Sequence, residues 1–241
     1  MKNPVLEKGA AKPALPVTLA EFRSRSPLTL EELCRRIYRN EYAGIIKKEE
    51  IAVPNLVKII RAVTHLSKKQ GYHAMSLRDL SRHTGLSMGG LYAYFSGKDD
   101  LLRMLFAEGK RVIHEALRDP ARDKSALEKL RYAVCAHLFL SESIPGIFRF
   151  FFMEAGSFDR INRTNVSGLE EETENIFTGI LEEGVETGEF RRIDPALAAS
   201  VLKSMLQSWY LKRSRFSRRK VTVEDYASFV LSTAEAAWSL K

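Results

Sequence analysis

A short stretch between Met75 and Leu102 carries side chains that could hold the backbone of a nucleic acid. Hydroxyl, guanidinium and ammonium groups donate hydrogen bonds to phosphate oxygens, and such contacts position a protein on DNA without reading its sequence. The residues of the stretch that could contact DNA are Arg78, Ser87, Met88, Gly89, Tyr92, Tyr94 and Lys98. The stretch therefore predicts a DNA-binding surface.

Two short helices around a glycine would position these side chains. Ser76 is a favoured N-cap, and Asp79 three residues later supplies the acidic half of a capping box. Gly85 can adopt the left-handed conformation that ends a helix, and Ser87 then caps a second helix. This is the layout of a helix-turn-helix motif, although the same corner also occurs in ordinary globular cores.

The ordered series of residues is more specific than the corner. It resembles the TetR/AcrR family of transcriptional regulators, whose signature runs Thr/Ser…Ile-Ala…Gly-Val-Ser…Leu-Tyr-x-Tyr-Phe-x-x-Lys-x-x-Leu. The matching residues are Ser76, Gly85, Ser87, Gly90, Leu91, Tyr92, Tyr94, Phe95, Lys98 and Leu101. The chain departs from the pattern at Met88, where the family often has Lys. This change removes a phosphate contact or shifts base readout towards apolar contact with a thymine methyl.

Composition agrees with a polyanionic partner but does not identify it. The 241 residues carry 38 Lys and Arg against 30 Asp and Glu, a net charge of +8, and 45% of them are hydrophobic. No apolar run approaches the roughly 20 residues that span a bilayer. The N-terminus is polar and lacks the apolar core of a signal peptide. We expect a cytoplasmic protein without a membrane partner.

Enzyme chemistry finds little support. No nucleophile elbow, phosphate loop or dinucleotide fingerprint occurs, so neither catalytic residues nor a cofactor is expected. Cys34 and Cys135 lie among apolar residues, which favours buried thiols over a redox switch. The histidines show no metal-ligand spacing with Cys or carboxylates, so no metal is expected; they are His65, His73, His83, His114 and His137.

Helical periodicity predicts an all-α fold. Residues 1–50 would be an N-terminal arm and an extra helix. The resemblance implies that residues 51–100 form a three-helix DNA-binding domain with a helix-turn-helix, and that residues 101–241 form a C-terminal helical domain for effector binding and dimerisation. Prolines up to residue 27 suggest a flexible arm. This arm either has no function or follows DNA beside the helix-turn-helix unit of residues 75–102, which we call the reader. The sequence leaves open whether the extra helix packs on the DNA-binding or the effector domain, and on which of the two subunits.

The last two predicted helices carry more apolar residues than one buried stripe needs. These are Ala198, Val201, Leu202, Met205, Leu206, Trp209, Tyr226, Phe229, Val230, Ala234, Ala237 and Trp238. Either they are buried within one chain, or they form a four-helix bundle with a second copy. The resemblance implies the homodimer. A two-fold dimer would place its readers about 34–36 Å apart on a near-palindromic operator.

The resemblance also implies an effector pocket in the helical body, through which a small molecule releases a repressor from DNA. Aromatic residues would suit a hydrophobic effector such as an acyl chain, although most such residues are simply core. The candidates are Phe139, Phe148, Phe152, Phe177 and Trp209. A DNA-binding protein without an effector is the alternative, and it would have no pocket.

A basic cluster stands between the last two helices. Its members are Lys212, Arg213, Arg215, Arg218, Arg219 and Lys220. Charge runs are usually solvated, so we favour a solvated loop over a site for an anionic effector or partner.

Overall fold

The computed structural model describes residues 15–46, 48–117, 123–154 and 160–239, with side chains of 153, 154 and 160–167 left aside. Among these residues no strand forms, apart from an isolated bridge between Phe190 and Ser239, and the prediction of an all-α fold is confirmed. The elements are α1 (Leu19–Arg25), α2 (Leu30–Ile37), the π-helical turn η2 (Tyr38–Tyr42), α3 (Glu49–Gln70), α4 (Leu77–Thr84), α5 (Met88–Tyr92), α6 (Lys98–Leu117), α7 (Ala126–Ser143), α8 (Pro145–Glu154), α9 (Arg160–Glu186), α10 (Pro195–Leu211), α11 (Arg213–Arg218) and α12 (Val223–Trp238).

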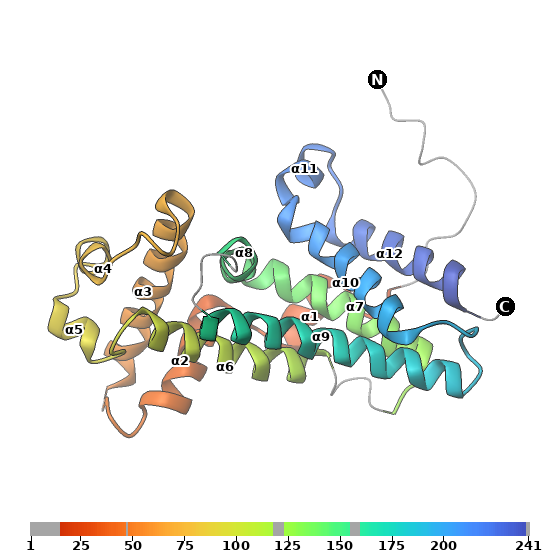
Figure 1. Cartoon of the computed structure of the whole chain (residues 1–241), viewed down its shortest axis with the longest axis horizontal. Helices are drawn as coiled ribbons and strands as arrows, with labels where there is room; N and C mark the ends of the chain where they lie inside the picture. The colour runs from red at the N-terminus through yellow and green to blue at the C-terminus, as the bar shows by residue number, and fades with distance from the viewer. Residues whose placement is uncertain (1–14, 47, 118–122, 155–159, 240–241) are drawn as a thin grey trace.

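The molecule is elongated, with α3, α4 and α5 at one end and the body of α7, α9, α10 and α12 at the other (Figure 1). Helix α6 runs from the end of the α4–α5 unit into the body, where it packs against α7 and α9. Within the described chain, no helix combines the length and apolarity needed to cross a bilayer.

The first helix of the DNA-binding unit, α3, begins at Glu49, two residues before the start predicted for that domain, and it contains Pro54. Pro54 lies in the second turn, where it cannot donate to the carbonyl oxygen of Glu50 and therefore disfavours the helix. Ala52 and Val53 are buried and extend the apolar face of the helix before Pro54.

The described part of the predicted flexible arm, residues 15–27, contains a helix. From residue 19 to residue 25 it forms α1, which begins with a capping box between Thr18 and Glu21. Phe22 is buried against Phe139 of α7, with ring centroids 5.9 Å apart. The capping box and the buried Phe22 thus stabilise a helix in this segment despite its prolines. This helix lies on the body, away from α4 and α5 (Figure 1). The rest of the predicted arm, residues 1–14, lies outside the described residues.

Within one chain, helix α2 packs on both α3 and α6, so it contacts both domains. Its Arg36 donates from Nε to Glu108 of α6 over 2.6 Å, and Asn40 of η2 donates to the same carboxylate over 2.8 Å. Arg111 completes the set over 2.9 Å. Glu108 is only 1% exposed, so its charge depends on these donors. The N-terminal extension is therefore held against α6 by an ion pair whose carboxylate is buried.

Both cysteines are buried free thiols, as predicted. Cys34 lies in α2 and Cys135 in α7, and neither side chain is exposed. Burial raises the pKa of each thiol to about 12, since the thiolate would lose its hydration.

The contact between Gly184 of α9 and the ring of Phe190 gives a test of the core. A Cβ atom at Gly184 would lie 2.0 Å from Cδ2 of Phe190, whose side chain is buried. We expect Gly184→Ala to lower the free energy of unfolding by about 1–3 kcal/mol, because overpacking forces the ring to move. Urea denaturation at a fixed protein concentration measures the change.

The matched control is Gly179→Ala in the same helix, where no atom lies within 4 Å of the added Cβ. That variant should be neutral or gain up to about 1 kcal/mol from the higher helix propensity of Ala. Equal effects of the two substitutions would contradict the packing described here.

Candidate functional site: nucleic-acid interface and cavity

Helix α4 begins and ends as its sequence indicates. The backbone N–H of Asp79 donates to Ser76 Oγ over 3.2 Å, while Ser76 donates from Oγ and from its backbone N–H to Asp79 Oδ2 over 2.7 and 2.9 Å. These hydrogen bonds from Ser76 lower the pKa of Asp79 to about 2. Gly85 follows in the left-handed conformation, with a φ of +73°. The capping box and the glycine stop are both confirmed.

Helix α5 is a single short turn whose outer face is open. Ser87 Oγ accepts a hydrogen bond from the backbone N–H of Gly90 over 3.0 Å. A Cβ atom at Gly90 would approach Ser87 Oγ to 3.3 Å, whereas one at Gly89 would meet nothing within 4 Å. The two glycines thus differ, because Gly90 lies against the cap and Gly89 opens to solvent.

Five of the seven predicted DNA contacts lie at the accessible surface of this unit. Arg78, Ser87, Gly89 and Tyr92 are exposed, and Met88 is half-buried. Within the described part of the chain, no hydrogen bond or ion pair occupies the Arg78 guanidinium or the Tyr92 hydroxyl. These donors are available to an external phosphate.

Tyr94 does not lie at that surface. Only 7% of it is exposed, and its hydroxyl accepts a hydrogen bond from Asn55 Nδ2 of α3 over 3.1 Å. Its ring packs edge-on against Tyr42, whose hydroxyl donates to the carbonyl oxygen of Tyr94. The predicted DNA contact at Tyr94 is therefore corrected: the residue joins α3 and η2 to the end of α5.

Lys98 is likewise engaged inside the protein. Its ammonium donates to the carbonyl oxygens of Met75, His73 and Tyr72 over 2.6, 3.1 and 3.2 Å, and it lies 5.0 Å from the centre of the Tyr72 ring. Partial burial lowers its pKa. The predicted phosphate contact is replaced by a connection between the α3–α4 link and the start of α6. Spacing along the sequence could not reveal these carbonyl partners.

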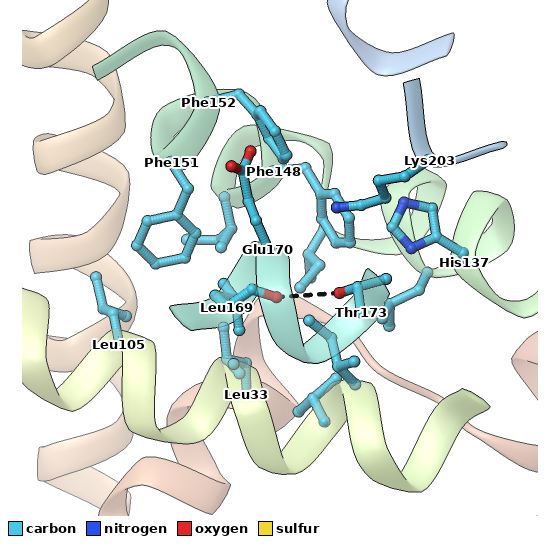
Figure 2. A pocket seen from close by; sticks show the side chains of 16 residues that line it. Leu33, Leu105, His137, Phe148, Phe151, Phe152, Leu169, Glu170, Thr173 and Lys203 are labelled. Atoms are coloured by element: carbon cyan, nitrogen blue, oxygen red, sulfur yellow. Dashed lines mark hydrogen bonds between the residues drawn. The ribbon is translucent and has the colours of Figure 1, made fainter. Parts of the chain in front are cut away.

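A narrow apolar cavity of about 50 Å³ lies in the body, enclosed by α6, α7, α8, α9 and α10 (Figure 2). Helix α2 adds one wall residue, Leu33. Helix α6 contributes four wall residues, Leu105, Gly109, Val112 and Ile113. The element that leads to the reader therefore also forms part of the cavity wall.

Two of the five aromatic residues predicted for an effector pocket, Phe148 and Phe152, line this cavity. The other three are core residues and correct the prediction. Phe139 packs against α1, Phe177 is fully buried, and Trp209 stacks on Phe216 with ring centroids 5.4 Å apart. Aromatic residues at helical spacing look alike in a sequence whether they face a cavity or a packed core.

The sequence did not predict the four polar residues of the cavity wall. His137, Glu170, Thr173 and Lys203 line the cavity. Lys203 could have been noticed in the sequence, because it is the one charged residue in the otherwise uncharged α10. Within the described part of the chain, no group of three or more His, Cys, Asp or Glu side chains could hold a metal ion.

The basic cluster at 212–220 is in part helical, as α11, and not a simple loop. Arg213 donates to both carboxylate oxygens of Glu142 over 2.7 and 3.1 Å and lies 4.7 Å from the Trp209 ring centre. The other members are exposed: Lys212, Arg215, Arg218, Arg219 and Lys220.

Known protein families match both the DNA-binding unit and the helical body of this chain. Residues 59–105 match the family described as "Bacterial regulatory proteins, tetR family". Residues 123–233 match the family described as "Tetracyclin repressor-like, C-terminal domain". The "Fatty acid metabolism regulator protein" of Bacillus subtilis (strain 168) is 26% identical over 151 residues, which are 62% of this chain and 78% of the relative.

Solved structures share the fold. The TetR family transcriptional regulator PfmR from Thermus thermophilus has a TM-score of 0.63 and 26% identity, covering 74% of this chain and 97% of that one. The regulator FadR from Bacillus subtilis, solved in complex with stearoyl-CoA, has a TM-score of 0.59 at 22% identity, covering 73% and 96%.

The carbonyl contacts of Lys98 predict a structural role that a substitution can separate from DNA binding. Lys98→Met should lower the free energy of unfolding by about 1–2 kcal/mol, at the low end for hydrogen bonds to a charge because Lys98 is half-buried. Thermal or urea denaturation provides the measurement.

Lys58→Met is the control, since Lys58 is exposed on α3, and it should leave stability unchanged. If Lys98→Met also left stability unchanged but weakened DNA binding with a shallower salt dependence, the original prediction of a phosphate contact would be restored.

Proposed function

Since the chain belongs to the TetR family of transcriptional regulators, we propose that it binds a near-palindromic operator as a homodimer and is released by a small-molecule effector. The observation that carries this proposal is the double role of α6. The helix starts at Lys98, directly after the DNA-reading unit, and four of its residues line the cavity. A ligand that displaces α6 would therefore move the reader.

For the DNA contacts we propose the accessible part of the predicted set. Arg78 and Tyr92 would donate to phosphates, and Ser87, at the N-terminus of α5, would add a hydroxyl. Gly89 would let the backbone approach base edges, and Met88 would make apolar contact with them.

For the homodimer we propose the outer faces of α10 and α12. Leu197 and Val201 of α10 are 64% and 50% exposed, and Phe229 of α12 is 65% exposed. Helices α10 and α12 pack against each other, so these apolar side chains belong to neighbouring helices. A second copy would cover them in a four-helix arrangement.

For the effector we propose a hydrophobic small molecule. The cavity wall is largely aliphatic and aromatic, and two of the similar proteins carry names that refer to fatty acid metabolism or to bound stearoyl-CoA. At about 50 Å³ the cavity is smaller than the roughly 300–1,000 Å³ of ligand sites. Binding would thus favour a conformation with α6 and α8 further apart, which is a shift between DNA-competent and DNA-incompetent states.

The small volume also favours a second candidate, a TetR-type DNA-binding protein with no effector. Selection of bound fragments from double-stranded DNA, followed by challenge of the complex with hydrophobic ligands, separates the two. Enrichment of a two-fold symmetric site supports the proposal, and failure to enrich any site contradicts it. Release by a ligand excludes the candidate without an effector.

Because the Arg78 guanidinium is exposed, we expect its removal to weaken DNA binding regardless of the DNA sequence. Arg78→Ala should weaken binding to all duplexes and reduce the salt slope of log K by about 0.9 per protomer, since each lost phosphate contact releases fewer counterions. Fluorescence anisotropy at several salt concentrations measures both quantities.

Arg192→Ala, in the exposed turn between α9 and α10 at the far end of the molecule, is the matched control and should change neither. A loss confined to one sequence, with the slope intact, would show that Arg78 reads a base instead.

The exposed ring of Phe229 lies in the proposed dimer interface, so a substitution there tests the oligomeric state. Phe229→Glu places a charge in the proposed interface, so sedimentation should show a monomer and operator affinity should fall at least tenfold, because burial of an unpaired charge is strongly unfavourable. Ile51→Glu, at a 51% exposed apolar site on α3, should sediment as the unmodified chain does. A monomeric unmodified chain would rule out the proposed dimer.

A further inference from the structure

Three buried polar side chains gather where His137 and Lys203 line the cavity, with Tyr210 packed against the wall residues Phe148 and Phe152. His137 of α7 is 1% exposed, and Lys203 and Tyr210 of α10 are 4% and 3% exposed. Lys203 and Tyr210 are seven residues apart, two helical turns, and so lie on the same face of α10. Figure 2 shows the Lys203 side chain beside the His137 ring, and the rings of His137 and Tyr210 are 6.1 Å apart.

These groups lack the partners that buried polar atoms normally have. Neither ring nitrogen of His137 nor the hydroxyl of Tyr210 makes a hydrogen bond among the described residues. In the same part of the chain, Lys203 Nζ has the Phe152 ring centre 5.4 Å away and forms no ion pair within 4.0 Å. Buried donors without partners are unusual and costly, so this cluster indicates a group that is bound from outside.

The surroundings define the charge that the cluster would accept. Burial lowers the pKa of Lys203 to about 8, opposed by the negative charges of Glu170 and Glu174, so the ammonium stays largely protonated at neutral pH. Burial also lowers the pKa of His137 well below 6.5 and raises that of Tyr210, which leaves both neutral. Three donor groups are therefore present, and among them Lys203 carries a positive charge.

We propose that His137, Lys203 and Tyr210 bind the carboxylate of an amphipathic carboxylic acid whose apolar part occupies the cavity. The assignment rests on the proposed function for its regulatory consequence alone, namely that this acid is the effector. A carboxylate carries one negative charge and accepts several hydrogen bonds, which matches three donors and one cation. A phosphate dianion would bring one more negative charge than a carboxylate among the phenylalanine rings and beside Glu170, which makes it the less favourable ligand.

The apolar part of the acid has a defined place. Phe148 packs against both His137 and Tyr210, with ring centroids 5.8 and 5.3 Å apart, and Phe152 lies 4.9 Å from Tyr210. From this aromatic end the cavity continues towards Leu105 and Leu33, which are apolar. An alkyl or aryl chain attached to the bound carboxylate would extend along these residues towards α6.

The test compares acids with their neutral analogues on the full chain without DNA. Isothermal titration with sodium octanoate, decanoate and phenylacetate is set against octan-1-ol, decan-1-ol and 2-phenylethanol. We expect at least one acid to bind at least tenfold more tightly than its alcohol. Lys203→Met should abolish that preference and retain alcohol binding. Tyr210→Phe, which removes only the hydroxyl, should weaken acid binding about threefold to tenfold, as expected for one hydrogen bond.

Lys129→Met is the matched control, because Lys129 is partly buried on α7 and its ammonium is paired with Glu183 outside the cavity. That variant should retain the acid preference. Lys203→Met should melt no lower than the unmodified chain, since it replaces an unpaired buried cation by an apolar side chain. Loss of folding in Lys203→Met would instead show a structural ion pair and overturn the proposal.

Several other outcomes would also overturn it. These are equal binding of acids and alcohols, an acid preference that survives Lys203→Met, binding of octanoyl-CoA but not octanoate, and no binding of any acid, which would leave only buried water at the cluster. Release of the selected operator is measured separately. Acid binding that depends on Lys203 but releases no DNA would contradict the proposed function and leave this assignment standing. Release of DNA by the alcohols alone would support the proposed function and contradict the carboxylate assignment.

Discussion

The buried carboxylate of Glu108 sets a constraint on much of this structure. It lies in the middle of α6, and its hydrogen bonds from Arg36, Asn40 and Arg111 compensate the lost hydration. A buried charge deprived of its partners is strongly destabilising, so the N-terminal extension and the bridging helix are held together. Because α2 also packs on α3, the extension connects the reader and the body on one side of α6.

Helix α6 consequently makes three groups of contacts along its length. Its first residue, Lys98, is joined to the link before α4 through backbone carbonyls. Its middle carries Glu108, and the cavity wall continues beyond it to Val112 and Ile113. A helix is stiff along its axis, so in the proposed mechanism a change at the cavity wall would move the DNA-binding unit as a rigid body. The extension would move with it, since Leu33 lines the same cavity.

The reader shows how far local sequence reasoning reaches. Ser76, Asp79, Gly85 and Ser87 act through hydrogen bonds or backbone conformations within a few residues, and each was identified from sequence. Tyr94 and Lys98 belong to the same motif but find their partners in η2, α3 and the link before α4. Nothing in the spacing of the motif specifies those partners. Part of the predicted DNA surface is therefore interior.

The sequence by itself determined the helical class, the caps of α4 and α5, the buried thiols and the resemblance to TetR regulators. These depend on local hydrogen bonding, on periodicity and on an ordered motif. Only the tertiary structure decided that Phe148 faces a cavity while Trp209 is core, that α1 docks on the body, and that Lys203 is buried beside His137. The physical reason is that burial and pairing depend on how distant helices meet, and helical spacing along one chain does not contain that information.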